Sequence, residues 1–124
     1  MITSKQLLGK ECEEAALRFL LKRGLRLVAR NYSTKLGEID LIMKDGEVLV
    51  FVEVRSKTDS THGTPLETID YAKRRRIEKV AAAYLRDYHI SQDVFCRFDA
   101  VGITITSDGE QKLEYIENAF WEGE

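Results

Sequence analysis

The chain has 124 residues, of which 44% are hydrophobic and 32% are charged, and its formal net charge is −2. This length allows one hydrophobic core and is too short for two ordinary domains, so residues 1–124 are predicted to form a single domain. The composition excludes a disordered chain, and the acidic balance excludes a strongly basic nucleic-acid coat protein, although it leaves room for an enzyme that acts on nucleic acid.

The first predicted element is a helix from Ser4 to Arg23, because apolar residues recur at helical spacing. This apolar stripe consists of Leu8, Cys12, Ala15, Ala16, Phe19 and Leu20. Gly24 is expected to end the helix as a C-cap residue. Leu25 to Tyr32 then alternate as a short strand.

A hairpin is predicted next, with strands at Ile39–Lys44 and Glu47–Lys57. The dipeptide Asp45-Gly46 between them favours a two-residue turn. A polar loop follows, and the run Thr64-Pro65-Leu66-Glu67 has the residues of a helix start. The second helix is expected to reach about Tyr88, with a break near Asp70 as the alternative.

Two further strands are predicted at Val94–Thr106 and Gln111–Glu117, joined by a turn over residues 107–110. The element order is therefore αβββαββ. It predicts an α/β fold in which two helices cover a mixed sheet.

The hairpin register decides which side chains share a face. A turn at Asp45-Gly46 would pair Asp40 with Phe51 and Glu38 with Glu53, and successive side chains alternate between faces. One face then carries Ile39, Leu41, Met43, Val48, Val50, Val52 and Val54. The other carries Glu38, Asp40, Glu53, Arg55 and Lys57 together with Ile42, Leu49 and Phe51. A three-residue turn would instead move Asp40 to the apolar face.

Asp40 and Glu53 are predicted to be diagonal neighbours, about 7–8 Å apart, from where both carboxylates can reach one cation. Mg²⁺ binds one or two carboxylates and leaves its remaining positions to water and phosphate. Arg55 or Lys57, on the same face, could orient a water or neutralise developing charge. A solvated surface with weak cross-strand ion pairs is the alternative.

Both helices carry charged residues beside their apolar stripes. Glu13 lies at the edge of the first stripe, where a carboxylate usually has a partner such as a metal; a glutamate reaching outward is the alternative. Lys73 falls on the buried stripe of the second helix, where it either extends outward or offers a cation to phosphate. Arg74, Arg75 and Arg76 point elsewhere and could contact a nucleic-acid backbone without regard to sequence.

Other features predict location and structure rather than chemistry. No apolar run reaches the roughly 20 residues of a membrane span, and the N-terminus lacks the layout of a signal peptide, so a cytoplasmic protein without membrane contact is expected. Cys12 and Cys96 lie far apart, and we interpret them as buried free thiols rather than zinc ligands. Arg97 and Asp99 share a face of a later strand and can pair with each other.

Several blocks of the sequence match a known pattern in order along nearly the whole chain. They are Gly9-x-x-Cys12-Glu13-x-x-Ala16, Arg30-Asn31, Gly37-Glu38-Ile39-Asp40-Leu41-Ile42, Phe51-Val52-Glu53-Val54-Arg55, Lys73, Arg97-Phe98-Asp99 and Asn118-Ala119-Phe120. This pattern resembles the YraN family of small bacterial proteins. The resemblance implies the restriction-endonuclease-like fold of the PD-(D/E)xK superfamily, near archaeal Holliday-junction resolvases, which cut branched DNA with Mg²⁺ or Mn²⁺.

The resemblance also implies roles for individual residues. Glu13, Asp40 and Glu53 would be the catalytic, metal-binding acids, and the backbone carbonyl of Val54 a further ligand for Mg²⁺ or Mn²⁺. Arg55 stands where the superfamily has a lysine, and an arginine cannot accept a proton. Lys57, on the same strand face, is the alternative catalytic cation.

The function implied is that of a metal-dependent endonuclease acting on DNA phosphodiesters, with branched or flap DNA as candidate substrates. The main alternative is a non-catalytic nucleic-acid-binding module on the same fold, which the arginine at position 55 and the acidic balance favour. A scaffold protein is less favoured, because five charged residues occupy the hairpin face. A homodimer would let two sites address two strands, although no residue indicates one.

Overall fold

The computed structural model describes residues 4–58, 66, 69–91 and 93–120. Its elements follow the predicted order αβββαββ. They are helix α1 (Ser4–Lys22), strands β1 (Arg26–Thr34), β2 (Gly37–Asp45) and β3 (Val48–Thr58), helix α2 (Tyr71–Asp87), and strands β4 (Cys96–Ile105) and β5 (Gln111–Phe120). Neither helix of the described chain combines the length and apolarity needed to cross a membrane.

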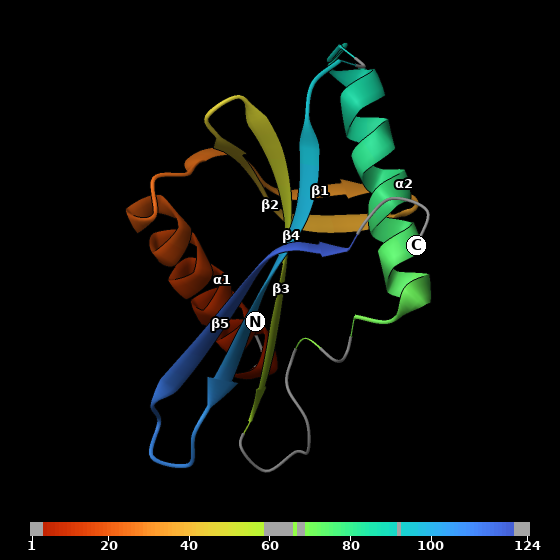
Figure 1. The fold of residues 1–124 in the computed structure, drawn as a ribbon. Coiled ribbons are helices and arrows are strands. Elements are labelled where there is room, and N and C mark those ends of the chain that lie inside the picture. Colours follow the sequence, from red (N-terminus) through yellow and green to blue (C-terminus); the bar gives the residue numbers. More distant parts are fainter. Residues whose placement is uncertain (1–3, 59–65, 67–68, 92, 121–124) are drawn as a thin grey trace.

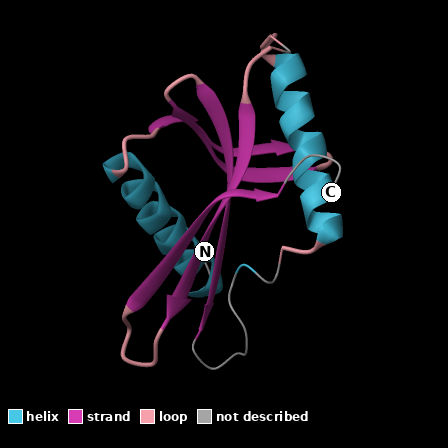
Figure 2. Cartoon of the chain, viewed as in Figure 1, coloured by secondary structure: helices cyan, strands magenta, loops and turns pink. Residues whose placement is uncertain are grey.

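The strands form one five-stranded sheet in the order β1-β2-β3-β4-β5. β3 and β4 run parallel, whereas the other neighbouring pairs are antiparallel. A parallel pair needs a crossover connection, and α2 lies in that connection. Figure 1 shows α1 and α2 on opposite sides of a twisted sheet, and Figure 2 shows the same arrangement coloured by secondary structure. The predicted mixed sheet with two covering helices, of the restriction-endonuclease-like type, is confirmed.

Both faces of the central strands are buried. Val50 and Val52 of β3 belong to the cluster that packs against α1, while Leu49 and Phe51 belong to the cluster against α2. A strand covered on both sides is expected to be a continuous apolar run, as residues 48–52 are. Helix α2 therefore covers the apolar residues of the face that was predicted to carry the charges. The charged residues of that face lie towards the end of β3.

The predicted hairpin register is wrong by two residues. Asp45 pairs with Val48, so the loop is Gly46-Glu47 and not Asp45-Gly46. Gly46 has φ 60°, and a type II′ turn places glycine at this first loop position. Because side chains alternate with a period of two, the shift leaves Leu41, Met43, Val50 and Val52 together on one face, as predicted. Ile39, which was predicted on that face, instead packs in the cluster against α2. The shift also changes the relation of Asp40 to Glu53 from diagonal to opposite.

Helix α2 begins later than the proposed start at residues 64–67, of which Thr64, Pro65 and Glu67 lie outside the described residues. Asp70 is the N-cap, and its side chain accepts a hydrogen bond of 2.9 Å from the Lys73 backbone N–H. This is the usual way in which aspartate satisfies a free donor of the first turn. Asp70 is thus the N-terminal boundary of α2, and most of the segment predicted to be helical before it lies outside the described residues. Neither Cys12 nor Cys96 forms a disulfide in the described part of the chain; Cys12 is buried, as predicted, whereas Cys96 is only partly buried.

Candidate functional site

Asp40 is the central residue of the candidate site. The β1–β2 register places Asn31 opposite it on one side. The β2–β3 pairing ends at Leu41 and Val52, and the same register continued by one residue places Glu53 opposite Asp40 on the other side. Asp40 Oδ2 accepts a hydrogen bond of 2.8 Å from the Val54 backbone N–H. A side chain therefore satisfies a backbone donor at the point where the two strands stop pairing.

The pKa of Asp40 is raised from 3.8 to about 7. Burial is the largest cause, and the charge of Glu53 is the second. The hydrogen bond from Val54 lowers the pKa, while the charges of Glu13 and Glu38 raise it further. Four acids are thus close enough for their charges to oppose one another, which is the situation that a bound cation relieves.

Glu53 is almost completely buried, with 4% of its surface exposed. Its Oε1 lies 3.5 Å from Lys73 Nζ and 3.6 Å from Arg55 Nε. Burial raises the pKa of Glu53, and the charges of Lys73 and Arg55 oppose that rise. Its Oε2 is buried without a hydrogen-bond partner among the described residues. Since buried polar atoms normally have a partner, Oε2 is a candidate ligand atom.

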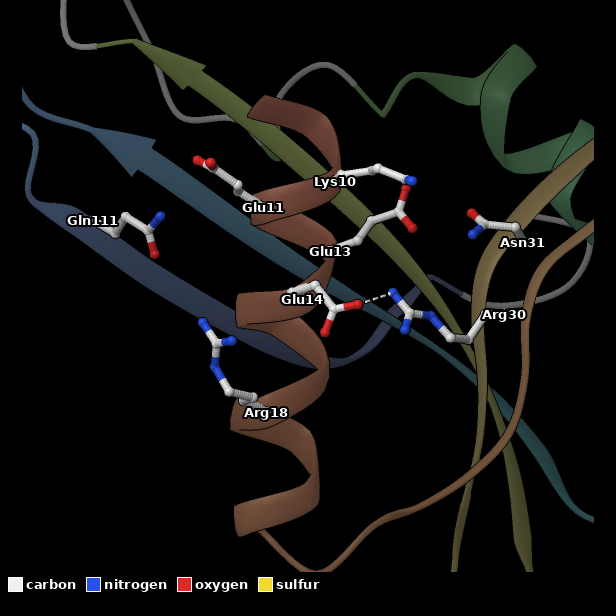
Figure 3. A pocket seen from close by; sticks show the side chains of 8 residues that line it. All are labelled: Lys10, Glu11, Glu13, Glu14, Arg18, Arg30, Asn31 and Gln111. Carbon is white, nitrogen blue, oxygen red and sulfur yellow. Dashed lines mark ion pairs between the residues drawn. The ribbon is translucent and has the colours of Figure 1, made fainter. Parts of the chain in front are cut away.

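Glu13 approaches the sheet from α1, as Figure 3 shows, with its carboxylate directed toward Asn31. The Asn31 side-chain nitrogen lies 3.1 Å from Glu13 Oε1 and 2.8 Å from Glu38 Oε1. The nitrogen is assigned to this side because carboxylates only accept hydrogen bonds. Burial, followed by the charge of Glu38, raises the pKa of Glu13. Glu13 therefore has a partner on the sheet and does not reach outward.

The fit of these acids to a divalent metal can be judged from their arrangement. As they stand, no three acidic, histidine or cysteine side chains in the described part of the chain converge on one point. Mg²⁺, however, needs only one or two carboxylates and keeps several waters. Asp40 and Glu53 meet that requirement, and the unpartnered Glu53 Oε2 is an acceptor that a cation would satisfy. Glu13 lies where it could act through a water.

Two cations lie near Glu53, one from the strand and one from helix α2. Arg55 is beside Glu53, as its place in β3 requires, and its Nε is buried without a hydrogen-bond partner among the described residues. Lys57, farther along β3, lines a hollow of about 500 Å³ with Arg55 and Gly9. Lys73, for which an outward course and a contact with phosphate were the two alternatives, forms an ion pair with Glu53. The lysine closest to the second acid is thus on the helix.

The three arginines that follow Lys73 do not form one surface. Arg74 lines a small cavity beside β4 and β5. Arg75 forms a 2.7 Å ion pair with Glu78 of the same helix. Arg76 is exposed and packs over Gly37 at the start of β2, where an added Cβ would lie 3.0 Å from two of its side-chain carbons. Of the three, Arg76 is the one beside the strand that carries Asp40.

Arg97 and Asp99 do pair with each other, at 3.0 Å. Asp99 is fully buried and also accepts hydrogen bonds from the Tyr115 hydroxyl and the Asn118 backbone N–H. Arg97 donates a further bond of 2.9 Å to Asp45. This network ties β4 to β5 and to the hairpin, which is a structural role.

Two residues of the site, Asn31 and Glu38, were not among the predicted site residues. Glu38 was predicted on the polar face of the hairpin, and that prediction was the available signal for it. Asn31 stands in the pattern that resembles the YraN family, but local sequence gives it no role. Its contacts come from α1 and β2, so its part in the site depends on the tertiary structure.

The fold and the acid cluster define a small α/β protein with a restriction-endonuclease-like core. A family model described as Uncharacterised protein family UPF0102 matches residues 12–103, a span that contains all four acids and Lys73. The chain belongs to this family, which is the YraN family that its motifs resemble.

Relatives in this family align over most of the chain. A UPF0102 protein of Pelotomaculum thermopropionicum is 42% identical over 121 residues, which cover 97% of this chain and 100% of the relative. One of Chromohalobacter salexigens is 46% identical over 112 residues, covering 90% and 89%. One of Anaeromyxobacter dehalogenans is 43% identical over 116 residues, covering 94% and 85%.

Proposed function

We propose that the protein is a metal-dependent endonuclease that hydrolyses DNA phosphodiesters, with branched or flap DNA as its substrates. The observation that carries this proposal is the pair formed by the partly buried Asp40 and the buried Glu53, which has an unpartnered carboxylate oxygen at Glu53 among the described residues. The restriction-endonuclease-like fold supports it by analogy, because a fold alone does not establish an activity.

Asp40 and Glu53 would hold Mg²⁺ or Mn²⁺, together with Glu13 and the Val54 carbonyl. When bound, such an ion polarises a phosphate oxygen and lowers the pKa of a water that attacks phosphorus. Asp40 must lose its proton for this role, and its pKa of about 7 in the metal-free protein means that binding would release protons near neutral pH.

Arg55 and Lys73 would neutralise the charge that develops on the phosphate. Both lie beside Glu53, and fixed cations at a partly buried site stabilise such charge more strongly than cations in water do. Arg55 stays protonated, so its role is electrostatic. The Asp70 cap holds the backbone of Lys73 in the first turn of α2, which fixes the direction of its approach. Lys57 lies farther along the same strand.

The DNA backbone would approach over the start of β2. Arg76 is exposed there, beside Gly37, and is suited to a phosphate contact that carries no sequence information. Arg74, which lines the cavity beside β4 and β5, and Arg75, which is paired with Glu78, are not part of this proposed contact.

The proposal is tested by incubating the protein with single-stranded, flap and four-way-junction DNA and Mn²⁺. Asp40→Asn and Glu53→Gln remove one charge each from the pair, and Glu47→Gln in the exposed hairpin loop is the matched control. We expect cleavage by the wild type and the control, and at least a hundredfold slower cleavage by the two site variants. Normal cleavage by Asp40→Asn would refute the site assignment.

A non-catalytic nucleic-acid-binding module is the second candidate. The arginine at position 55 favours it, as does the ion pair that engages the ammonium of Lys73 with Glu53. It predicts binding of the same DNAs without cleavage at any Mn²⁺ concentration, and binding that Asp40→Asn leaves unchanged. Electrophoretic mobility shifts measured on the cleavage samples separate the two candidates.

A further inference from the structure

Side chains on β1 change faces at Asn31. In a regular strand, residues two apart point to the same side. Arg30, however, forms an ion pair with Glu14 of α1, whereas Tyr32 packs edge-on against Tyr84 of α2, with ring centroids 5.1 Å apart. The two neighbours of Asn31 thus face opposite sides of the sheet.

The same reversal occurs on the neighbouring strand at Asp40. Leu41 belongs to the cluster against α1, and Ile39 belongs to the cluster against α2. Asn31 and Asp40 are opposite each other in the β1–β2 register, which is continuous across them. The two strands therefore change faces together at the candidate site.

The backbone of Asn31 explains this reversal. Its φ is 51°, in the left-handed region, which L-residues rarely adopt and which asparagine tolerates better than most. A left-handed residue within a strand interrupts the alternation, so that Arg30 and Asn31 both line the hollow of about 450 Å³ beside α1, drawn in Figure 3.

The side chain of Asn31 combines tolerance of this backbone conformation with two N–H donors. Its amide has two N–H groups, and the two carboxylates of Glu13 and Glu38 lie within hydrogen-bond distance of the nitrogen. Aspartate at this position would add a third charge, and glycine would offer no donor. The amide bridges two acids that otherwise repel each other.

We infer that Asn31 is a positioning residue that holds Glu13 of α1 against the acid site on the sheet. The inference rests on the proposed function, because the site that Asn31 serves is the proposed metal site. Asn31 does not touch the metal or the phosphate in this proposal; it acts through Glu13. Groups that orient a metal ligand in this way commonly change metal affinity by 10–100-fold when they are removed.

Asn31→Gly is the variant that isolates the amide. Glycine adopts a positive φ without steric cost, so the left-handed turn is kept while the donor is lost. Asn118→Gly is a matched control, because Asn118 on β5 also has φ 51° and contacts Asp99 through its backbone N–H, which glycine retains. Thermal denaturation is expected to show both variants folded.

Mn²⁺ binding, followed by electron paramagnetic resonance, tests the inference. We expect Asn31→Gly to weaken Mn²⁺ binding by about tenfold and Asn118→Gly to leave it unchanged. In a Glu13→Gln background, Asn31→Gly should have less than a twofold effect, because the group it acts through is already altered. Unchanged Mn²⁺ affinity in Asn31→Gly, or an equal loss in both backgrounds, would overturn the inference.

A measurement without metal separates this inference from the proposed function. In the metal-free protein, Glu13→Gln and Glu38→Gln should each shift the side-chain amide resonances of Asn31 in NMR spectra. Glu11→Gln, an exposed acid on the same helix, should not. If wild type binds no Mn²⁺ but these shifts appear, the proposed function fails while Asn31 still bridges the two acids. If Glu13→Gln leaves the resonances unmoved, the inference fails whatever the protein does.

Discussion

Lys73 Nζ of α2 lies 3.5 Å from Glu53 Oε1 of β3, so the lysine beside the second acid comes from the helix and not from the strand. Arg55 Nε approaches the same oxygen at 3.6 Å. Both distances exceed a normal hydrogen bond, so the contacts are ion pairs. Two cations share Oε1 and leave Oε2 available.

Replacing Lys73 by methionine should destabilise the protein. The variant removes one of two cations from a carboxylate that is 4% exposed. Breaking a buried pair completely costs about 3–5 kcal/mol; because Arg55 remains and Lys73 is partly exposed, we expect a loss of about 1–3 kcal/mol in the free energy of unfolding. Urea denaturation measures it. Lys79→Met, on the exposed part of the same helix, is the control, and an equal loss there would contradict the role of the ion pair.

The raised pKa of Asp40 predicts that stability falls as pH rises. Its pKa is about 7 in the folded protein and near 3.8 without burial and neighbouring acids. Between these values the folded chain binds more protons than the unfolded chain, so the free energy of unfolding decreases with pH over this window. Urea denaturation of the metal-free protein at pH 5, 6, 7 and 8 should show the decrease.

Asp40→Asn tests whether Asp40 contributes to this decrease. Asparagine keeps an oxygen that can accept the hydrogen bond from Val54, but it carries no charge. The decrease between pH 5 and 7 should be clearly smaller in Asp40→Asn than in wild type. Parallel curves for the two proteins would show that Asp40 does not titrate in this range.

Gly37 should resist substitution by alanine. Its φ of 151° disfavours L-residues, and a Cβ would lie 3.0 Å from the Arg76 side chain. Backbone strain of this kind costs about 1–3 kcal/mol. Gly109→Ala in the β4–β5 turn is the control. Gly109 has φ 89° and no atom within 4 Å of its Cβ position, so this variant measures the cost of backbone strain without a side-chain contact. A smaller loss of unfolding free energy at Gly37 than at Gly109 would contradict the contact with Arg76.

Some parts of this arrangement could be predicted because they depend on local pattern. The faces of Leu41, Val50 and Val52 follow from alternation, which survives a register error of two residues. The opposition of Asp40 and Glu53 could not be predicted in this way. Two-residue loops at Asp45-Gly46 and at Gly46-Glu47 both suit the local sequence, and the observed register depends on how the strands pack.

Other parts depend on helix geometry or on tertiary contacts. Adjacent residues on a helix are 100° apart, so Arg74, Arg75 and Arg76 are spread around α2, and only Arg76 lies over the start of β2. The left-handed Asn31 needed knowledge of Glu13 and Glu38, because its conformation is supported by contacts from another helix and another strand. Local propensity only permits such a conformation.

The ion-pair network around Asp99 should affect stability without affecting the acid site. Asp99 is fully buried, and burial together with the hydrogen bond to Asp99 raises the pKa of Tyr115 well above its usual range. Tyr115→Phe removes that donor and leaves a buried carboxylate with fewer hydrogen bonds. The expected loss in the free energy of unfolding is about 1–3 kcal/mol.

Tyr71→Phe is the control for Tyr115→Phe, because Tyr71 at the start of α2 is 60% exposed; the free energy of unfolding of this variant should change little. Mn²⁺ affinity in Tyr115→Phe should equal that of wild type, since no residue of the Asp99 network is among the four acids. A Mn²⁺ affinity that fell together with stability would mean that β4 and β5 support the site through this network, and would contradict its separate structural role.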